Sequence, residues 1–598
     1  MAEKNDKRIL LSLKNVDVKF NVRGRILSAI RNVSLDIYEN ESLAIVGESG
    51  SGKSVLTKTF AGLLDSNGFI SNGSIIFSDD EISKTDVTLT ARRKSLLKNV
   101  TNTLNSYSRL ERGSKEYVEY LALKKEIELA KTATAEQEDE FRKKDKQLED
   151  MIVDKTNYLW TLDKKNDSEE YTKATKLISE YKAEKKELEK KHKAEVRKRK
   201  HLYKNDAARI SADKEKMQQL LELRQKKIAT PDKEGNPFGL SDEVIERNKR
   251  IGYEVLLSIG RYPLKSQLLF VPKLKKAFKL AMRIGEDLSN PEVLNRIFEV
   301  VAFRVEFRSY DEEKGVLHGY AILDCAKVKY TNDWQQIRGC RIATVFQDPM
   351  TSLNPVITIG KQIMTVITKH QKCSNAEAKA RTLDIMRKVG IPEPEKRFND
   401  YPFEYSGGMR QRIVIAIALS CQPKILICDE PTTALDVTIQ AQILRLIKDL
   451  QHELGFTTVY ITHDLGVVAN VAERVAVLYA GQVVEVGTVE DIFYDPRHPY
   501  TWALLSSLPQ LAERGSELFS IPGTPPSLYN KIVGDAFAPR NKYCLAIDFV
   551  EEPPIFEVSP THWAKTWLLD PRAPKTEIPE NIRNLHEKIM KTHVDFDE

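Results

Sequence analysis

The chain contains one glycine-rich stretch that ends in a lysine and a serine, Gly47-Glu48-Ser49-Gly50-Ser51-Gly52-Lys53-Ser54. The apolar residues 42–46 before it predict a buried parallel strand, and Val55 to Leu64 predict the helix that follows. This spacing between a strand and a helix predicts a phosphate-binding loop. The glycines let backbone N–H groups turn inward around nucleotide phosphates, Lys53 places its charge on the β and γ phosphates, and Ser54 offers its hydroxyl to Mg²⁺.

Length and composition indicate several domains and no strong polyanion partner. The chain has 598 residues, of which 41% are hydrophobic and 30% are charged. This is too long for one hydrophobic core, so we expect about three or four domains. The net charge of +6 is small against 92 basic and 86 acidic residues, and it argues only weakly for binding to a polyanion.

Cysteine spacing and hydropathy indicate in which cellular compartment the protein works. The six cysteines lack the paired spacing of a zinc site or a disulfide framework, which favours a reducing compartment. Residues 1–8 are charged and lack a signal-peptide core, and no stretch approaches the ~18 consecutive apolar residues of a membrane span. If the protein works at a membrane, we expect it to dock on a partner that spans it.

Residues 8–46 alternate apolar and polar positions, which predicts an antiparallel β layer. Phe20 lies in this pattern, and its ring either stacks on an adenine or packs in the core; the pattern leaves both open. From Ser114 to Thr230 there is neither glycine nor proline. Apolar residues at three-four spacing on both sides of a polar break at residues 163–167 predict two amphipathic helices in an antiparallel hairpin, although Lys185 and His192 occupy seam positions.

The basic run at residues 190–200 admits two interpretations. It could contact RNA or anionic lipid, or it could be a solvated helix face. Interleaved acids and the lack of an aromatic stacking platform favour the solvated face. Residues 231–316 have globular composition again but carry no recognisable motif.

Further motifs supply the groups that a phosphate loop requires. An apolar strand ends in Asp429-Glu430, which delivers one carboxylate to Mg²⁺ and a second to polarise the attacking water. His463 follows the next apolar strand and is placed to hydrogen-bond the γ-phosphate, while Gln347 can reach both metal and water. Residues 406–408, Ser-Gly-Gly, open a helix and offer N–H groups to an anion. Each motif alone has a structural alternative, but together they make coincidence negligible.

These residues resemble the ATP-binding-cassette family closely, over about residues 8–80 and 325–500. The resemblance implies an α/β fold with a parallel-sheet core, an antiparallel β layer and an α-helical subdomain, and two cassettes that dimerise head to tail so that each signature caps the partner's nucleotide. It assigns catalysis to Glu430, His463 and Gln347, and Mg²⁺ to Ser54, Gln347 and Asp429. It assigns nucleotide binding to Phe20, Gly47, Glu48, Ser49, Gly50, Ser51, Gly52, Lys53, Ser54, Val55, Ser406, Gly407, Gly408, Met409 and Asp436.

Finer motifs resemble the oligopeptide and dipeptide permease ATPases, nearest to the D-type subunit. They lie at residues 346–355, 409–412, 431–438, 498–501 and 521–523. The resemblance implies an ATP-hydrolysing subunit of an oligopeptide importer on the cytoplasmic face of the cell membrane. It further implies an F-type ATPase partner, two membrane-spanning permeases, indirectly an extracellular peptide-binding protein, and no nucleic acid. The segment after Gln347 would receive the permease's coupling helix.

The chain departs from the family by an insertion between Lys53 and Gln347. We expect the cassette over residues 1–80 and 325–500, an insertion over residues 81–324, and a C-terminal oligopeptide-transporter-type extension over residues 501–598. Within the insertion we expect the hairpin at about 114–230 and a small globular part at about 231–316. The point where the cassette resumes is ambiguous, because residues 73–77 and 319–323 could each be the strand that the family places there.

The second departure concerns a C-terminal four-cysteine cluster that many relatives carry for an iron–sulfur centre. The corresponding positions here hold Asp535, Asn541, Asp548 and Thr566, and Cys544 alone cannot hold a cluster. We therefore expect ATP and Mg²⁺ as cofactors and no iron–sulfur cluster.

Two rival classes remain. Chromosome-organising and DNA-repair ATPases also split a cassette with a coiled coil, but their insertion follows the glutamine loop, whereas Gln347 lies downstream of the insertion here. Soluble translation factors of the cassette family could bind RNA through residues 190–200, but they normally carry two cassettes, and this chain has a single phosphate loop. Both comparisons favour the importer.

Overall fold

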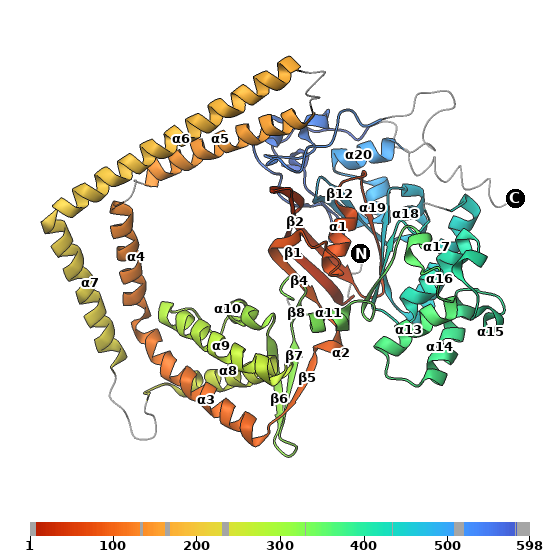
Figure 1. Ribbon diagram of the computed structural model, residues 1–598, viewed down its shortest axis with the longest axis horizontal. Coiled ribbons are helices and arrows are strands. Elements are labelled where there is room, and N and C mark those ends of the chain that lie inside the picture. Colours follow the sequence, from red (N-terminus) through yellow and green to blue (C-terminus); the bar gives the residue numbers. More distant parts are fainter. Residues whose placement is uncertain are drawn as a thin grey trace. The chain divides into compact units, whose positions relative to one another are not determined.

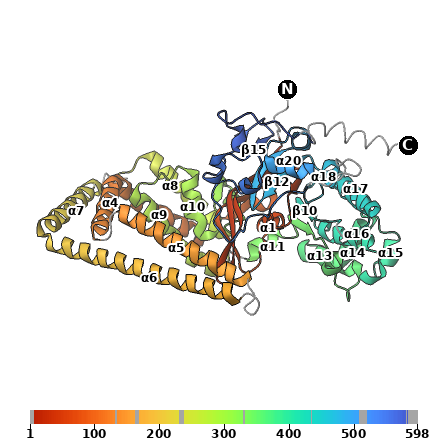
Figure 2. The same cartoon turned by 90° about the horizontal axis from the view of Figure 1, so that it is seen from above.

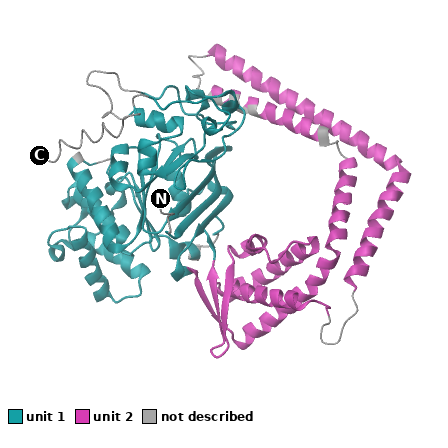
Figure 3. Ribbon diagram, turned by 180° about the vertical axis from the view of Figure 1, so that it is seen from behind, with its two compact units in different colours: residues 1–82, 322–598 teal, residues 83–321 magenta. Residues whose placement is uncertain are grey.

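The computed structural model divides the chain into two compact units (Figure 3). Unit 1 comprises residues 1–82 and 322–598, and unit 2 comprises residues 83–321, where the sequence predicted an insertion over residues 81–324. The structure describes residues 7–131, 135–161, 168–229, 238–328, 331–432, 435–507, 520–579 and 582. The predicted polar break at residues 163–167 lies outside the described residues, as does Ala434 of the predicted Ala434-Leu435-Asp436 motif.

An antiparallel layer in unit 1 is formed in the order β2-β1-β4-β8, as Figure 1 shows. Its strands are β1 (Ile9–Val22), β2 (Arg25–Tyr38), β4 (Gly68–Phe77) and β8 (Leu323–Asp324). The ambiguous strand is thereby located: residues 68–77 pair with β1, whereas most of the alternative belongs to β7 (Val316–Ala321) of unit 2. Only Leu323 and Asp324 join the layer, opposite Phe77 and Ile76.

The central sheet of unit 1 has the order β14-β15-β13-β12-β3-β11-β10-β9. Strands β9 (Ile342–Val345), β10 (Ile425–Asp429), β11 (Thr457–Thr462), β3 (Ser42–Val46) and β12 (Arg474–Tyr479) run parallel. Strands β13 (Gln482–Thr488), β15 (Trp563–Ala564) and β14 (Phe556–Glu557) continue antiparallel. All residues of β3, β11 and β12 are buried, as expected for strands covered on both faces.

Helices cover this sheet and form a separate helical part of unit 1 (Figure 1). Helix α1 (Lys53–Phe60) follows the phosphate loop. The others in this unit include α12 (Pro349–Ser352), α13 (Ile359–His370), α14 (Asn375–Lys388), α15 (Pro394–Arg397), α16 (Gly407–Leu419), α17 (Val437–Leu454), α18 (Leu465–Val471), α19 (Val489–Tyr494) and α20 (Pro499–Ser506). Among the described helices of the chain, none is long and apolar enough to cross a lipid bilayer.

Unit 2 contains a small globular part around a three-stranded sheet, β5-β7-β6. Strands β5 (Lys84–Thr88), β6 (Val305–Asp311) and β7 pack with helices α3 (Ala91–Ser108), α8 (Asp242–Gly260), α9 (Leu264–Ile284) and α10 (Pro291–Phe298). Arg304 donates two hydrogen bonds to Glu254, at 2.7 and 2.8 Å, in the interior. Because a buried charge without a partner is costly, this pair ties β6 to α8 in one arrangement.

The rest of unit 2 is a long helical hairpin whose arms are each divided in two (Figures 1 and 2). Helix α4 (Ser114–Ala130) packs along α7 (Ala207–Ile228), and α5 (Ala135–Thr161) packs along α6 (Ser168–Asn205). The sequence predicted one helix in each arm, and this prediction was wrong because each arm contains two helices. Asp206 interrupts the second arm because its side chain accepts a hydrogen bond from the Arg209 backbone N–H at 3.0 Å, which caps α7.

The two polar residues in the hairpin seam have acidic partners on the facing helix. Lys185 Nζ lies 3.5 Å from Asp145 and 3.4 Å from Glu149, and His192 Nε2 lies 3.4 Å from Glu138. These contacts run antiparallel, since the later residue on α6 meets the earlier residue on α5. The irregular seam positions therefore match a complementary charge pattern and fix the register of the hairpin.

We predict that Lys185→Glu loosens α5 from α6, because it places like charges against Asp145 and Glu149. The free energy of local opening should fall by about 1 kcal/mol, which corresponds to amide hydrogen exchange about fivefold faster in both helices. Lys186→Glu is the matched control, since Lys186 is exposed. Equal exchange in the two variants would contradict the assigned register.

Candidate functional site

The parallel register of the central sheet brings the predicted site residues to one edge. Val46 at the end of β3 lies opposite Thr462 at the end of β11, and Asp429 at the end of β10 lies opposite Ile461. Because the carboxyl ends of parallel strands meet at the same edge, the loop after β3, the acids after β10 and the histidine after β11 become neighbours.

The glycines of the loop are required by close backbone contacts. Gly47 and Gly52 have φ of +153° and +106°, and a Cβ on Gly47 would lie 2.1 Å from the Leu478 carbonyl oxygen. A Cβ on Gly52 would lie 2.9 Å from Ile30 Cδ1. The buried Ser51 hydroxyl has no hydrogen-bond partner among the described residues. The loop therefore leaves no room for side chains at Gly47 and Gly52, and the Ser51 hydroxyl has an unused hydrogen-bonding capacity. Both features fit a phosphate-binding loop.

Lys53 lies across the loop. Its Nζ donates to the carbonyl oxygens of Gly47 and Glu48, at 2.7 and 3.0 Å. Burial lowers the pKa of this ammonium, and the carboxylates of Glu430, Asp429 and Glu48 oppose the shift. The positive charge is thus held in place before any phosphate binds.

Ser54 and Asp429 form a pair of oxygen ligands at the start of α1. The Ser54 hydroxyl donates to Asp429 Oδ1 at 3.1 Å, and burial raises the pKa of the Asp429 carboxyl. A hydroxyl and a carboxylate are ligands that Mg²⁺ accepts in nucleotide sites. The residues present therefore fit this ion.

Glu430 connects two of the other predicted catalytic residues. Gln347 Nε2 donates to Glu430 Oε2 at 3.1 Å, and His463 Nδ1 lies 3.1 Å from Glu430 Oε1. Glu430 has φ of +45°, and its backbone N–H donates to the Ile461 carbonyl at 3.0 Å. A non-glycine residue in this conformation is strained, so the fold holds the carboxylate at this point against a local preference.

The C-terminal region supports the loop through contacts that the sequence analysis missed. Arg540 donates to both carboxylate oxygens of Glu48, at 2.7 and 3.0 Å, and its side chain is only 5% exposed. The Tyr500 hydroxyl accepts from the Glu48 backbone N–H at 2.7 Å. The His-Pro-Tyr-Thr tail motif at residues 498–501 was the signal for Tyr500, but no local pattern pointed Arg540 to the loop.

The predicted signature residues lie apart from the loop of the same chain. Ser406 caps α16 without a side-chain hydrogen bond, and Asp436 does the same for α17. In the described part of the chain, no hydrogen bond joins residues 406–409 to residues 47–54. The ring of Phe20 covers Gly68 and the residue is 9% exposed, so packing accounts for this aromatic by itself. Adenine stacking by Phe20 remains a prediction.

The four positions at which the family resemblance implies cluster cysteines are buried and close local turns. Asp535, Asn541, Asp548 and Thr566 each accept a hydrogen bond from a nearby backbone N–H, at 3.0, 2.9, 2.6 and 3.3 Å. Their side chains thus form the turns of this region directly. The absence of an iron–sulfur cluster remains a prediction.

The sequence matches the ABC transporter family over residues 30–225 and 312–433, and the oligopeptide/dipeptide transporter C-terminal region over residues 484–547. It is 60% identical over 312 residues to the oligopeptide transport ATP-binding protein AmiE of Streptococcus pneumoniae, a match that covers 52% of this chain and 85% of the relative. It is 60% identical over 261 residues to OppD of Bacillus subtilis, covering 44% and 73%. The dipeptide transport ATP-binding protein DppD of Lactococcus lactis is 54% identical over 310 residues, covering 52% and 87%.

We predict that Arg540→Ala raises the nucleotide concentration needed for half-maximal binding about tenfold, because the Glu48 carboxylate in the loop loses its bidentate hydrogen-bond donor. Arg540→Lys should recover only part of the lost nucleotide affinity, since lysine keeps the positive charge but lacks the planar guanidinium that binds both carboxylate oxygens. Titration with a fluorescent ATP analogue measures the effect.

Arg572→Ala is the matched control for this experiment. Arg572 also bridges an acid through two nitrogens, Asp570, but its side chain is 84% exposed. Equal nucleotide affinity in the Arg540 and Arg572 variants would show that the C-terminal contact does not support the loop.

Proposed function

The chain belongs to the ABC transporter family and is an ATPase of that family, and we propose that it is the ATP-hydrolysing subunit of a membrane importer for oligopeptides. The observation that carries the proposal is the conjunction of two features in one unit: a nucleotide half-site at the sheet edge, and a C-terminal region of the oligopeptide/dipeptide transporter type that contacts that half-site through Arg540. Relatives at 60% identity are named as oligopeptide transport ATP-binding proteins.

In the proposed hydrolysis, Glu430 polarises the attacking water and accepts its proton. Gln347 and His463, each 3.1 Å from a Glu430 oxygen, orient that carboxylate. His463 also reaches the γ-phosphate side of the site, where it stabilises the charge that develops as the bond to the leaving phosphate breaks. Lys53 and the backbone N–H groups of the loop hold the phosphates in line.

We assign the Mg²⁺ of the nucleotide to Ser54 and Asp429, with Gln347 as a further ligand. The ion supplies positive charge against the phosphate oxygens. The contact of Ser54 with Asp429 supports this assignment, because the two oxygens already converge. Gln347 would then connect the metal to the carboxylate that activates water.

The proposal includes a second ATPase subunit, of the F type. Ser406 and Gly407 open α16 with a hydroxyl free of capping and an exposed backbone, but they make no hydrogen bond to their own chain's loop in the described residues. A helix start that offers N–H groups to an anion, and that is not hydrogen-bonded to the described loop of its own chain, supports a role in closing a partner's nucleotide site, with Met409 and Asp436 beside it.

Exposed apolar side chains near Gln347 support docking to a membrane-spanning permease. Phe346, Met350, Val356 and Phe403 are 41%, 60%, 78% and 67% exposed. Arg410 contacts both the Met350 sulfur and the Phe403 carbonyl oxygen, so exposed apolar residues of two segments lie close together, as they do in interaction surfaces. We propose that this surface receives the permease and holds the chain at the cytoplasmic face of the membrane.

The basic run at residues 190–200 does not favour the alternative of nucleic-acid binding. Lys191, Lys193 and Arg199 lie 2.8, 3.4 and 3.7 Å from glutamates one helical turn earlier on α6. Three of the seven lysines and arginines in this run are therefore matched by acids of the same helix, as in a solvated face.

We predict that Glu430→Gln retains ATP binding while lowering the hydrolysis rate at least about 100-fold, because the amide cannot accept the proton of water. Lys53→Ala should instead weaken nucleotide binding itself. Glu473→Gln is the control, since Glu473 is an exposed acid paired only with Lys7 in the described contacts. An unchanged hydrolysis rate in Glu430→Gln would remove Glu430 from its proposed role.

Purification of the native assembly from membranes, with identification of every chain that co-purifies, tests the importer proposal. We expect two multi-span permeases and a second cassette ATPase. A variant with Met350→Glu and Val356→Glu should lose the permeases but keep nucleotide binding, because only the docking surface is changed. Stimulation of the ATPase by ribosomes or nucleic acid, with no permease recovered, would contradict the proposal.

A further inference from the structure

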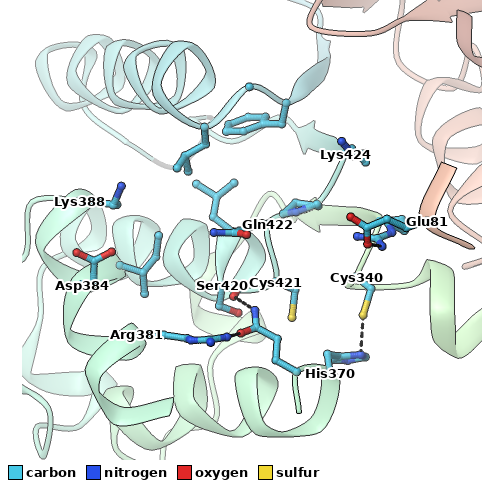
Figure 4. A pocket seen from close by; sticks show the side chains of 18 of the residues that line it. Glu81, Cys340, His370, Arg381, Asp384, Lys388, Ser420, Cys421, Gln422 and Lys424 are labelled. Carbon is cyan, nitrogen blue, oxygen red and sulfur yellow. Dashed lines mark hydrogen bonds and ion pairs between the residues drawn. The ribbon is translucent and has the colours of Figure 1, made fainter. Parts of the chain in front are cut away.

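A cavity of about 1240 Å³ in unit 1 contains a cysteine pair that the ATPase chemistry does not use (Figure 4). Cys340 lies in the turn before β9, and Cys421 follows the end of α16. Both line the cavity, together with His370 at the end of α13. Cys340 is partly exposed, whereas Cys421 is buried.

The imidazole of His370 contacts the Cys340 sulfur directly. His370 Nδ1 lies 2.9 Å from Cys340 Sγ, and the ring lies over the turn, so that a Cβ on Gly339 would meet Nε2 at 3.7 Å. The neighbouring Cys421 thiol, together with the charges of His370 and Arg341, lowers the pKa of Cys340 to about 6 against the effect of burial. Cys340 is therefore largely a thiolate at neutral pH.

The arginines near Cys340 form ion pairs or hydrogen bonds with other residues. Arg341 pairs with Asp79 and Glu81, and Arg381 donates to Gln371. The Glu81 carboxylate thus opposes part of the Arg341 charge. The imidazole of His370 is in direct contact with the Cys340 sulfur.

The backbones that carry the two cysteines are joined by hydrogen bonds. The Arg341 carbonyl accepts from the N–H groups of Lys424 and Ile425, at 2.8 and 2.9 Å. The parallel pairing of β9 with β10 continues from this point. Cys340 and Cys421 also line the same cavity (Figure 4), so the two thiols are neighbours on connected backbone segments, as a disulfide requires.

We propose that Cys340 is an oxidation site for hydroperoxides, with Cys421 as the resolving thiol. The Cys340 thiolate attacks the terminal oxygen of the hydroperoxide, the O–O bond breaks, and the leaving oxygen takes up a proton. Cys421 then attacks the resulting sulfenic sulfur, and the hydroxyl leaves as water with the Cys421 proton. With hydrogen peroxide, two thiols are oxidised to one disulfide and the peroxide is reduced to two waters.

The first test is a non-reducing tryptic map of the full chain after treatment with hydrogen peroxide. We expect a linked species of residues 339–341 and 413–424, which carry Cys340 and Cys421. In Cys421→Ser, the oxidation should stop at a sulfenic acid on Cys340 that dimedone traps. Sulfinic acid at Cys340 in the native sequence without the linked peptides would overturn the proposal.

The second test is the pH dependence of alkylation by iodoacetamide. At pH 6.5 we expect Cys340 to react about fivefold faster than Cys373 and Cys544, with a midpoint near pH 6. His370→Gln should move the midpoint towards the ordinary thiol range near 8.5, whereas the exposed-site control His452→Gln should not. Equal reactivity of the three cysteines would show that the cavity does not activate Cys340.

Discussion

The hydrogen-bonded register of β9, β10, β11 and β3 is the constraint on which the rest of the structure depends. Each strand is largely buried, and the predicted site residues begin at its carboxyl end or within two residues after it, all at the same edge of the sheet. A slip of one strand by one residue would move the predicted site residue at its end by more than 3 Å, or about the length of a hydrogen bond. The precision of the site therefore comes from main-chain pairing, and the side chains of Gln347, Glu430 and His463 only complete it.

The same principle explains how the cassette accommodates unit 2. The chain leaves the antiparallel layer after β4 and returns at β8, where Phe77 and Leu323 are directly paired. The Cys325 backbone N–H also donates to the Ile75 carbonyl at 2.7 Å. Because the two ends of the inserted segment are neighbours on adjacent strands, the cassette closes as it would without the segment. The helices of unit 2 can therefore be long without changing the pairing of the strands that position the predicted nucleotide site.

The sequence was sufficient for the features that are local in the chain. The glycine loop, the acids after β10 and the helical periodicity of the hairpin each depend on residues close to one another, so their spacing reveals them. Contacts between segments that are distant in the chain could not be predicted from the sequence. Arg540 and Glu48 are 492 positions apart, and the acids opposite Lys185 are identified only once the helices are paired. The strand ambiguity at residues 73–77 and 319–323 had the same origin, because both segments have strand composition and only pairing distinguishes them.

The two edges of the parallel sheet carry different chemistry. The residues predicted to bind nucleotide lie at or after the carboxyl ends of the strands, whereas Cys340 and Cys421 precede the amino ends of β9 and β10. Strand β9 is only four residues long and connects Cys340 at one end with Gln347 at the other. Helix α16 likewise begins at the predicted signature and ends two residues before Cys421. A covalent bond at the amino edge would therefore join the two elements whose opposite ends carry Gln347 and Ser406. Because a packed interior has low compressibility, that bond would restrict how far the two motifs can move relative to one another.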